Sequence, residues 1–436
     1  MASTTLPAAE RRGDESGHDW GNLAWAVGAA FGCYFCMYAF RKPFTAAGYE
    51  GTSVWGGGFK PVLVTAQILG YMVSKFMGIK VIAELPREKR AIWIVKLIVA
   101  GEAALVLFAL LPRPWNALAL FLNGLPLGMV FGLVLGFLEG RRMTEALTAG
   151  LSTSFILADG ATKSVGAWLL TRGVSEEWMP AVAGLLFLPP LAICVAMLAQ
   201  VAPPTALDVE ARTERPTMQR HERRSFVVRY AAGLAPLVVF YLLVTILRSL
   251  RGDFAPELWR DLGRSAVPGD FARSEFWVAL AVLLVNGAAV LVRDNRRAFI
   301  ASLLLCALGV IALAGALAAQ GAGRIGPFTF MVLLGLGLYV SYVAMHTTVF
   351  ERLLAMTRER ANLGFLMYLV DSFGYLGVVA VMIAKNLGLV HDGALDLVRQ
   401  AGWITCVTGG LCLTASLVYF SLHSRRTTTP EEAKEM

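Results

Sequence analysis

The sequence predicts an all-α integral membrane protein with twelve transmembrane helices arranged as two pseudo-symmetric six-helix bundles. Composition supports the membrane class, because 56% of the 436 residues are hydrophobic and only 16% are charged, whereas soluble domains are nearer a quarter charged. Apolar runs of about twenty residues, each long enough to cross a bilayer as a helix, recur along nearly the whole chain. A weak similarity between the two halves predicts the two bundles.

A polar segment divides the predicted spans into six and six. The spans of the first half, residues 21–201, are 21–40, 59–82, 91–112, 115–139, 145–171 and 178–201. Those of the second half, residues 226–422, are 226–250, 274–293, 297–319, 327–350, 361–385 and 400–422. Residues 202–225 are polar and contain prolines, so we expect a linker there. Residues 1–20 and 423–436 are the polar terminal segments.

The basic residues predict the orientation. They gather in loops on the side that holds both termini: Arg11, Arg12, 87–90, Arg141, Arg142, the linker, Arg293, Arg296, Arg297, 358–360, Arg425 and Arg426. Because cytoplasmic loops are enriched in Lys and Arg, both termini are predicted to be cytoplasmic. The same loops explain the net charge of +8, so nucleic acid is not an expected partner.

The sequence offers no pattern for catalysis or metal binding. All six cysteines lie in apolar runs, and Cys33 and Cys36 have no second pair to complete a metal site, so both are expected to be packing residues. We find no phosphate-binding glycine loop, zinc-binding HExxH or nucleophile motif. The chain is therefore predicted not to be an enzyme and to need no cofactor.

Three short matches support an internal repeat. A shift of 207 residues carries Arg41 onto Arg248 and "RAI" at 90–92 onto "RAF" at 297–299, and a shift of 208 carries "KSVG" at 163–166 onto "DSFG" at 371–374. In transporters built from repeats, the substrate site lies between them near the middle of the membrane. The repeat therefore predicts a site that both halves share.

Arg41 and Arg248 are the first candidates for this site. An isolated arginine at a helix end can simply extend toward the lipid headgroups. Two arginines at equivalent positions can instead converge on one anion, and the guanidinium group suits phosphate or carboxylate. Lys42 points about 100° away from Arg41 and is expected to be an interfacial anchor. Pro43 fits the end of a helix.

Ionisable groups inside spans are costly and are therefore candidates for function. Lys75 lies deep in its span, either as a pocket cation or in a structural ion pair, and Tyr71 precedes it by one turn on the same face. Asp159 and Lys163 share a helix face, either as a structural pair or as a site where substrate or a proton competes for Lys163. Asp371 either pairs across the interface, with Lys75 or an arginine, or titrates as a proton-coupling group.

Other ionisable groups are given packing or anchoring roles. Glu102 and Lys96 are expected to be packing residues, and Arg229 an anchor at the cytoplasmic end of its span. His346 is expected to be a hydrogen-bonded packing histidine rather than a ligand.

Five segments resemble a known family. "MYAFRKPF" at 37–44, "YMVSKFMG" at 71–78, "KSVG" at 163–166, "LRSLRGDFAPELW" at 247–259 and "DSFGYLG" at 371–377 are similar to motifs of the organophosphate:phosphate antiporters of the major facilitator superfamily. This family includes the glycerol-3-phosphate and hexose-phosphate transporters. The resemblance implies two bundles that rock around a central site, in a multi-pass protein of the inner (cytoplasmic) membrane. It also implies a small anionic substrate.

The resemblance assigns roles to particular residues. It implies that Arg41 and Arg248 hold the phosphate group from opposite halves. It places the other pocket residues of the family on one lysine and three tyrosines: Lys75, Tyr38, Tyr71 and Tyr375.

Three residues depart from the family pattern. Lys163 stands where the family has a histidine, and Asp159 and Asp371 replace uncharged residues. Four basic and two acidic candidates leave two positive charges in excess, which suits a divalent anion. The predicted function is secondary transport of a phosphorylated metabolite. The alternatives are a proton-coupled symporter of a non-phosphorylated anion and a transporter-like sensor.

Overall fold

The computed structural model describes residues 8–54, 57–138, 144–201, 220–289, 292, 294–357, 363–389 and 393–427. The first half consists of six long helices with two 3-10 helices and a two-stranded hairpin after the first: α1 (Ala8–Met37), η1 (Tyr38–Phe40), η2 (Pro43–Ala46), β1 (Ser53–Val54), β2 (Gly57–Gly58), α2 (Phe59–Glu84), α3 (Arg87–Leu110), α4 (Asn116–Leu138), α5 (Thr144–Thr171) and α6 (Met179–Ala199).

The second half is also helical throughout the part that the structure describes. Its elements are α8 (Arg220–Arg229), α9 (Ala231–Asp253), α10 (Ala255–Asp261), α11 (Pro268–Ala289), α12 (Asn295–Gly321), α13 (Pro327–Ala344), η3 (Met345–Val349), α14 (Phe350–Thr357), α15 (Leu363–Asn386) and α16 (Ala394–Thr427). The segment η3 is a π-helix that joins α13 to α14. Most of the predicted linker, and many of the arginines that predict the orientation, lie outside the described residues.

The predicted fold class is confirmed. Within the described ranges, nine helices are long and apolar enough to cross a membrane by length and composition. The other three predicted spans correspond to α1, α2 and α5. Two of these, α2 and α5, carry Lys75, Asp159 and Lys163, and they pack against helices of the other half, α15 and α11. Their charged side chains can therefore face protein instead of lipid.

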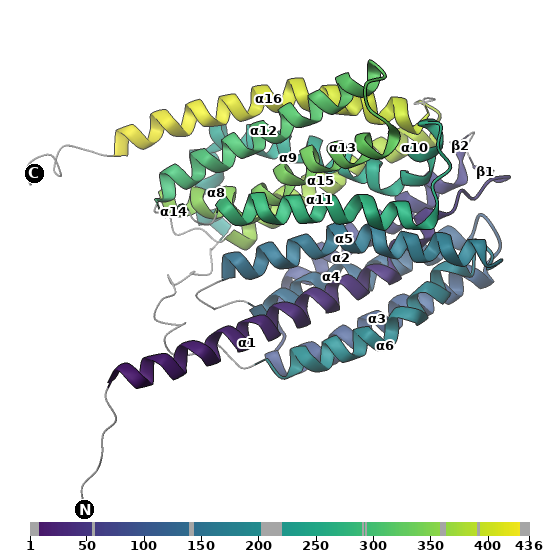
Figure 1. Ribbon diagram of the computed structural model, residues 1–436, viewed down its shortest axis with the longest axis horizontal. Coiled ribbons are helices and arrows are strands. Elements are labelled where there is room, and N and C mark those ends of the chain that lie inside the picture. Colours follow the sequence, from purple (N-terminus) through teal and green to yellow (C-terminus); the bar gives the residue numbers. More distant parts are fainter. Residues whose placement is uncertain are drawn as a thin grey trace, which may run out of the picture.

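The helices form two layers that follow the two halves of the sequence (Figure 1). Helices α1 to α6 lie together in the lower layer and α9 to α16 in the upper layer, with α5 and α11 along the contact between them. The start of α1 and the end of α16 lie at one end, which we call the terminal end. The hairpin and α10 lie at the other, the distal end.

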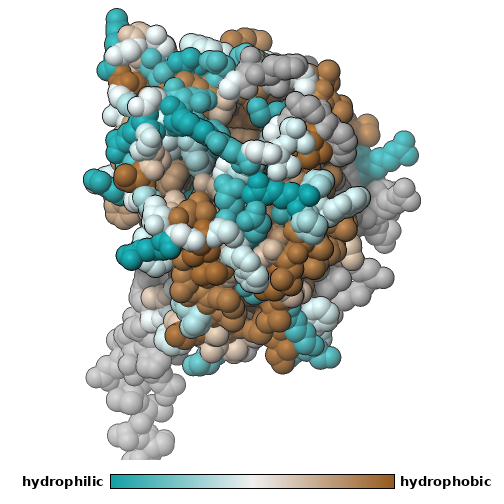
Figure 2. Space-filling model, turned by 90° about the vertical axis from the view of Figure 1, so that its right-hand side faces the viewer, coloured by the Kyte–Doolittle hydropathy of each residue, from teal (hydrophilic) through white to brown (hydrophobic). Residues whose placement is uncertain are grey.

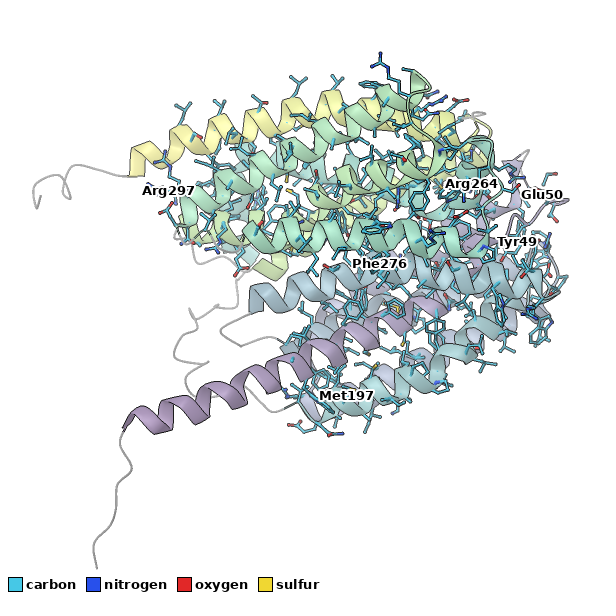
Figure 3. All side chains as sticks on the ribbon, in the orientation of Figure 1. Tyr49, Glu50, Met197, Arg264, Phe276 and Arg297 are labelled. Atoms are coloured by element: carbon cyan, nitrogen blue, oxygen red, sulfur yellow. The ribbon has the colours of Figure 1, made fainter. Side chains whose placement is uncertain are left out.

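The surface follows the expected division between lipid and water. Large apolar side chains such as Leu186, Ile311 and Leu411 are more than half exposed, as expected for helices that face hydrocarbon. Figure 2 views the distal end, where hydrophilic residues gather across the middle of the face and hydrophobic residues lie around it. Glu50 and Arg264 lie at this end, and Arg297 lies at the terminal end (Figure 3).

Glycines allow α2 and α4 to pack closely. A Cβ atom at Gly124 of α4 would clash with the carbonyl oxygen of Gln67, and one at Gly70 of α2 would clash with that of Phe121. The backbones can approach only because neither residue has a side chain. This contact forms part of the wall that supports the residues described next.

Candidate substrate-binding site

Arg41 lies at a break in the first span. Helix α1 ends at Met37, and the chain tightens into η1 before Pro43, which cannot donate a backbone hydrogen bond, begins η2. The amide groups of Arg41 and Lys42 both donate to the carbonyl of Tyr38, at 3.0 and 2.8 Å. The break turns the two neighbouring cations in different directions.

Amide side chains from α2 and α4 fix the position of Arg41. The Nε2 of Gln67 donates to the carbonyl of Arg41 at 3.0 Å and to the Oδ1 of Asn123 at 2.9 Å. Asn123 in turn donates to the carbonyl of Phe40 at 3.1 Å. These bonds satisfy carbonyl groups that a helix end leaves free, and they fix the backbone at Arg41.

Within the described part of the chain, no carboxylate balances the charges of Arg41 and Arg248. The guanidinium carbon of Arg41 lies 3.9 Å from the centre of the Tyr71 ring, and that of Arg248 lies 4.7 Å from the centre of Tyr342. Among the residues the structure describes, neither arginine forms an ion pair, and the buried Nε atom of each has no hydrogen-bond partner. Cation–π contact favours such a charge but leaves it uncompensated.

The two arginines lie near a common set of tyrosines. Tyr38 and Tyr375 each interact electrostatically with both Arg41 and Arg248. The rings of Tyr71 and Tyr375, from α2 and α15, lie 5.4 Å apart across the boundary between the halves. The structure thus brings together five of the sequence candidates: Arg41, Arg248, Tyr38, Tyr71 and Tyr375.

Lys75 and Asp371 form an ion pair between the halves. The pair joins α2 to α15, and its side chains are 13% and 11% exposed. For Asp371, this is the first of the two alternatives from the sequence, with Lys75 as the partner. Lys75 also lies 5.2 Å from the ring centre of Tyr375, so the pair adjoins the arginines.

Two further residues complete this group, which we call the central network: Lys75, Asp371, Tyr241 and His346. The hydroxyl of Tyr241 donates to the Oδ1 of Asp371 at 2.5 Å and lies 2.5 Å from the Nε2 of His346. His346 is hydrogen-bonded, as the sequence analysis expected, but it lies in the site rather than in ordinary packing. The spacing of Tyr339, Tyr342 and His346, three and four residues apart, places them on one helix face and could have revealed this.

A second cluster lies toward the distal end. Lys42 pairs with Asp253 at 2.5 Å and lies 3.7 Å from Asp159. Lys163 pairs with Asp159, one turn away on α5, and donates to the carbonyl of Gly252 on α9. We call Lys42, Asp159, Lys163 and Asp253 the distal cluster; its two positive and two negative charges balance, and it joins the halves.

The distal cluster corrects one prediction and sharpens another. Lys42 is 8% exposed, so its prediction as an interfacial anchor is wrong. The cause is Asp253, a residue 211 positions away that only folding brings near. Asp159 and Lys163 do pair on one face; Asp159 also lies near Lys42, and Lys163 donates to the carbonyl of Gly252 in the second half.

Comparison with known proteins identifies the family. The sequence matches, over residues 43–423, a family model described as a family of unknown function, DUF5690. The chain belongs to the DUF5690 family. No curated protein matches the sequence significantly.

Solved structures show that this DUF5690 chain has the major facilitator fold. A D-xylose–proton symporter matches with a TM-score of 0.57 and 14% identity, over 91% of this chain and 96% of that one. A mutant of the nucleoside transporter NupG matches with 0.56 and 14%, over 92% and 99%. The human organic anion transporter MFSD10 (TETRAN) matches with 0.56 and 13%, over 91% and 98%.

The remaining ionisable candidates lie apart from the central residues. Lys96 lies over Trp93, with 5.5 Å from its ammonium nitrogen to the ring centre, and Arg229 lies over Tyr230 at 5.7 Å. Glu102 is buried on α3, and among the described residues neither of its carboxylate oxygens has a hydrogen-bond partner. In this DUF5690 member, Glu102 therefore lies within the first half, separate from the ions that join the halves.

Proposed function

We propose that the protein is a secondary transporter of a small organic anion, most simply a phosphorylated metabolite, which it holds between Arg41 and Arg248. One observation carries this proposal: each half contributes an arginine that has a buried Nε atom and no acidic partner among the described residues. Burying an uncompensated charge is costly. An anion bound between the two arginines would remove that cost, and phosphate oxygens match the donor geometry of guanidinium.

The charge balance supports a divalent substrate. The distal cluster is neutral, and Lys75 is neutralised by Asp371. Arg41 and Arg248 are left with two positive charges. The excess is the one the sequence predicts, but Lys163 and Asp159 no longer contribute to it.

Contacts between the halves support alternating access. Toward the distal end the halves are joined by the distal cluster, by Lys60 with Glu257 at 2.7 Å, and by Asn386 with Thr65 at 3.1 Å. In the described residues, polar contacts between the halves extend from this end to the level of Lys75 and Asp371. We propose that the structure represents the state closed at the distal end. Substrate contacts from both halves would then change the balance between two such states.

A ligand-binding screen tests the proposal. Purified protein is heated with inorganic phosphate, glycerol 3-phosphate, glucose 6-phosphate, sulfate or succinate, and unfolding is followed. A ligand at 100 times its Kd stabilises the folded state by about 2.7 kcal/mol. We expect a phosphorylated ligand to stabilise the wild type, and Arg41→Lys and Arg248→Lys to lose most of this effect because a bidentate contact is lost.

The control is Arg260→Lys, because Arg260 is 60% exposed on α10 and pairs with Glu50, an exposed glutamate. This variant should keep the full ligand effect. Equal stabilisation of the wild type, Arg41→Lys and Arg248→Lys would rule out the arginine site. Uptake of the same ligand into proteoliposomes would establish transport, whereas binding without uptake would indicate a sensor.

A further inference from the structure

We propose that transport is coupled to a proton, which His346 and Tyr241 deliver to Asp371 when the substrate anion draws Lys75 away from that carboxylate. This inference rests on the proposed function, because the substrate is what competes for Lys75. It assigns roles to Tyr241 and His346, which the sequence analysis did not place in the site.

The hydrogen bonds define a chain with one direction. Tyr241 has a single hydroxyl proton, and it donates this proton to the Oδ1 of Asp371. At 2.5 Å from the same hydroxyl oxygen, the Nε2 of His346 must therefore be the donor of the second bond. The chain runs from the Nε2–H of His346 through the O–H of Tyr241 to Asp371.

A proton can move along this chain without leaving any atom with the wrong number of bonds. The Nδ1 of His346 accepts an incoming proton, the Nε2 proton passes to the oxygen of Tyr241, and the hydroxyl proton of Tyr241 passes to Asp371. The result is a neutral Asp371, a neutral Tyr241 and the other neutral tautomer of His346. Nothing is oxidised or reduced, and one positive charge has been added to the network.

Lys75 connects this step to the substrate. In the structure its ammonium group is paired with Asp371 and lies 5.5 Å from the ring centre of Tyr71, which also contacts Arg41, and 5.2 Å from that of Tyr375. If an anion between the arginines attracts Lys75, Asp371 loses its partner in a buried setting, where an unpaired carboxylate is costly. Taking up a proton removes that cost.

The charged and titratable groups around the chain come from five elements. Asp371 and Tyr375 belong to α15, Lys75 and Tyr71 to α2, and Arg248 and Tyr241 to α9. Tyr342 of α13 stacks on Tyr241 with 5.4 Å between ring centres, and its ring lies tilted against His346 at 4.6 Å. The positive charges of Lys75 and Arg248 repel a further positive charge on His346. A substrate anion that neutralises these two cations therefore also favours protonation of the imidazole.

The backbone at His346 is unusual. The histidine lies in η3, the π-helical turn between α13 and α14, and single π-helical turns occur frequently at functional sites. It also lies closer to the terminal end than Tyr342 and Tyr339 on the same helix face. The chain would therefore accept its proton from the side opposite the distal cluster.

The test measures proton uptake when ligand binds to purified protein in weakly buffered solution. The ligand is the phosphate compound that gives the largest stabilisation in the screen above. We expect about one proton per bound ligand for the wild type and none for Asp371→Asn, which still binds. Glu102→Gln, which alters another buried carboxylate, should take up the same number as the wild type.

Transport rates distinguish a role in proton delivery from a purely structural role for Tyr241 and His346. In proteoliposomes, Tyr241→Phe and His346→Gln should slow proton-driven uptake by at least about tenfold, because a proton-transfer step is lost, while proton uptake on binding stays at one. A variant that merely unfolded the site would lose binding as well. Asp371→Asn should exchange labelled ligand across the membrane but not accumulate it in response to a pH gradient.

The outcomes distinguish the two proposals. If wild-type protein binds and transports the ligand with no proton uptake, or if Asp371→Asn takes up the same number, proton coupling is overturned and the arginine site stands. If no ligand depends on Arg41 and Arg248, the proposed function fails first.

Discussion

Replacing Lys42 with methionine should open the distal end. Lys42 is the ammonium group between Asp253 and Asp159, and the pair with Asp253 has side chains only 10% and 6% exposed. Removing one partner of a buried ion pair costs about 3–5 kcal/mol. Because the pair joins the two halves, this cost falls on the state in which they meet at the distal end. The ratio of open to closed protein should rise by more than about 100-fold, since 1.4 kcal/mol corresponds to a factor of ten.

Cysteine labelling measures this shift. In a cysteine-free background, Thr45→Cys places a thiol at a position that is 0% exposed, beside Lys42 in η2. A membrane-impermeant maleimide should react slowly with this thiol when Lys42 is present and much faster after Lys42→Met. The labelling rate should rise with the population of the open state until that state dominates. The double variant Lys42→Asp and Asp253→Lys exchanges the two charges and restores an ion pair. It should therefore label more slowly than Lys42→Met, although faster than the protein with the native pair.

The chain offers a matched control. Arg260 and Glu50 also join the two halves at the distal end, but their side chains are 60% and 77% exposed. Exposed ion pairs contribute at most about 1 kcal/mol, so Arg260→Gln should leave labelling almost unchanged. If Lys42→Met labelled no faster than Arg260→Gln, the distal cluster would not be what closes this end.

Three further predictions concern stability. Gly124→Leu should destabilise the first half by about 1–3 kcal/mol, because α2 leaves no space for a side chain there; Gly315→Ala, which meets open space, should have little effect on the unfolding temperature. Glu102→Met should raise that temperature, since it removes a buried carboxylate without partners, and an unchanged or lower value would show an unrecognised role. Glu275→Gln should lower the free energy of unfolding by about 3–5 kcal/mol, because it leaves Arg251 without its carboxylate partner in the interior. Chemical unfolding in detergent measures this loss. A loss smaller than that of Arg260→Gln would contradict the prediction.

The candidate site was only partly predictable. The repeat indicated Arg41 and Arg248 because duplication leaves matching residues at a fixed offset, and that trace survives in the sequence. The sequence marks Asp371 as a carboxylate that is costly to place inside a span. Its ion-pair partner, Lys75, lies 296 positions away, so the sequence leaves it as one of several candidate partners. His346 and Tyr241 are 105 positions apart, and no local pattern connects them.

The sequence by itself determined the fold class and the order of the spans. Both follow from the length and polarity of consecutive segments, which are local properties. The tertiary structure alone decided which charges are neutralised. Lys42 and Arg41 are neighbours with the same charge, yet Lys42 is paired with Asp253, whereas Arg41 lies over Tyr71 with no acidic partner in the part of the chain that the structure describes. That difference depends on which side chains of the second half meet the first, because the energy of a buried charge is set by its nearest partners in space.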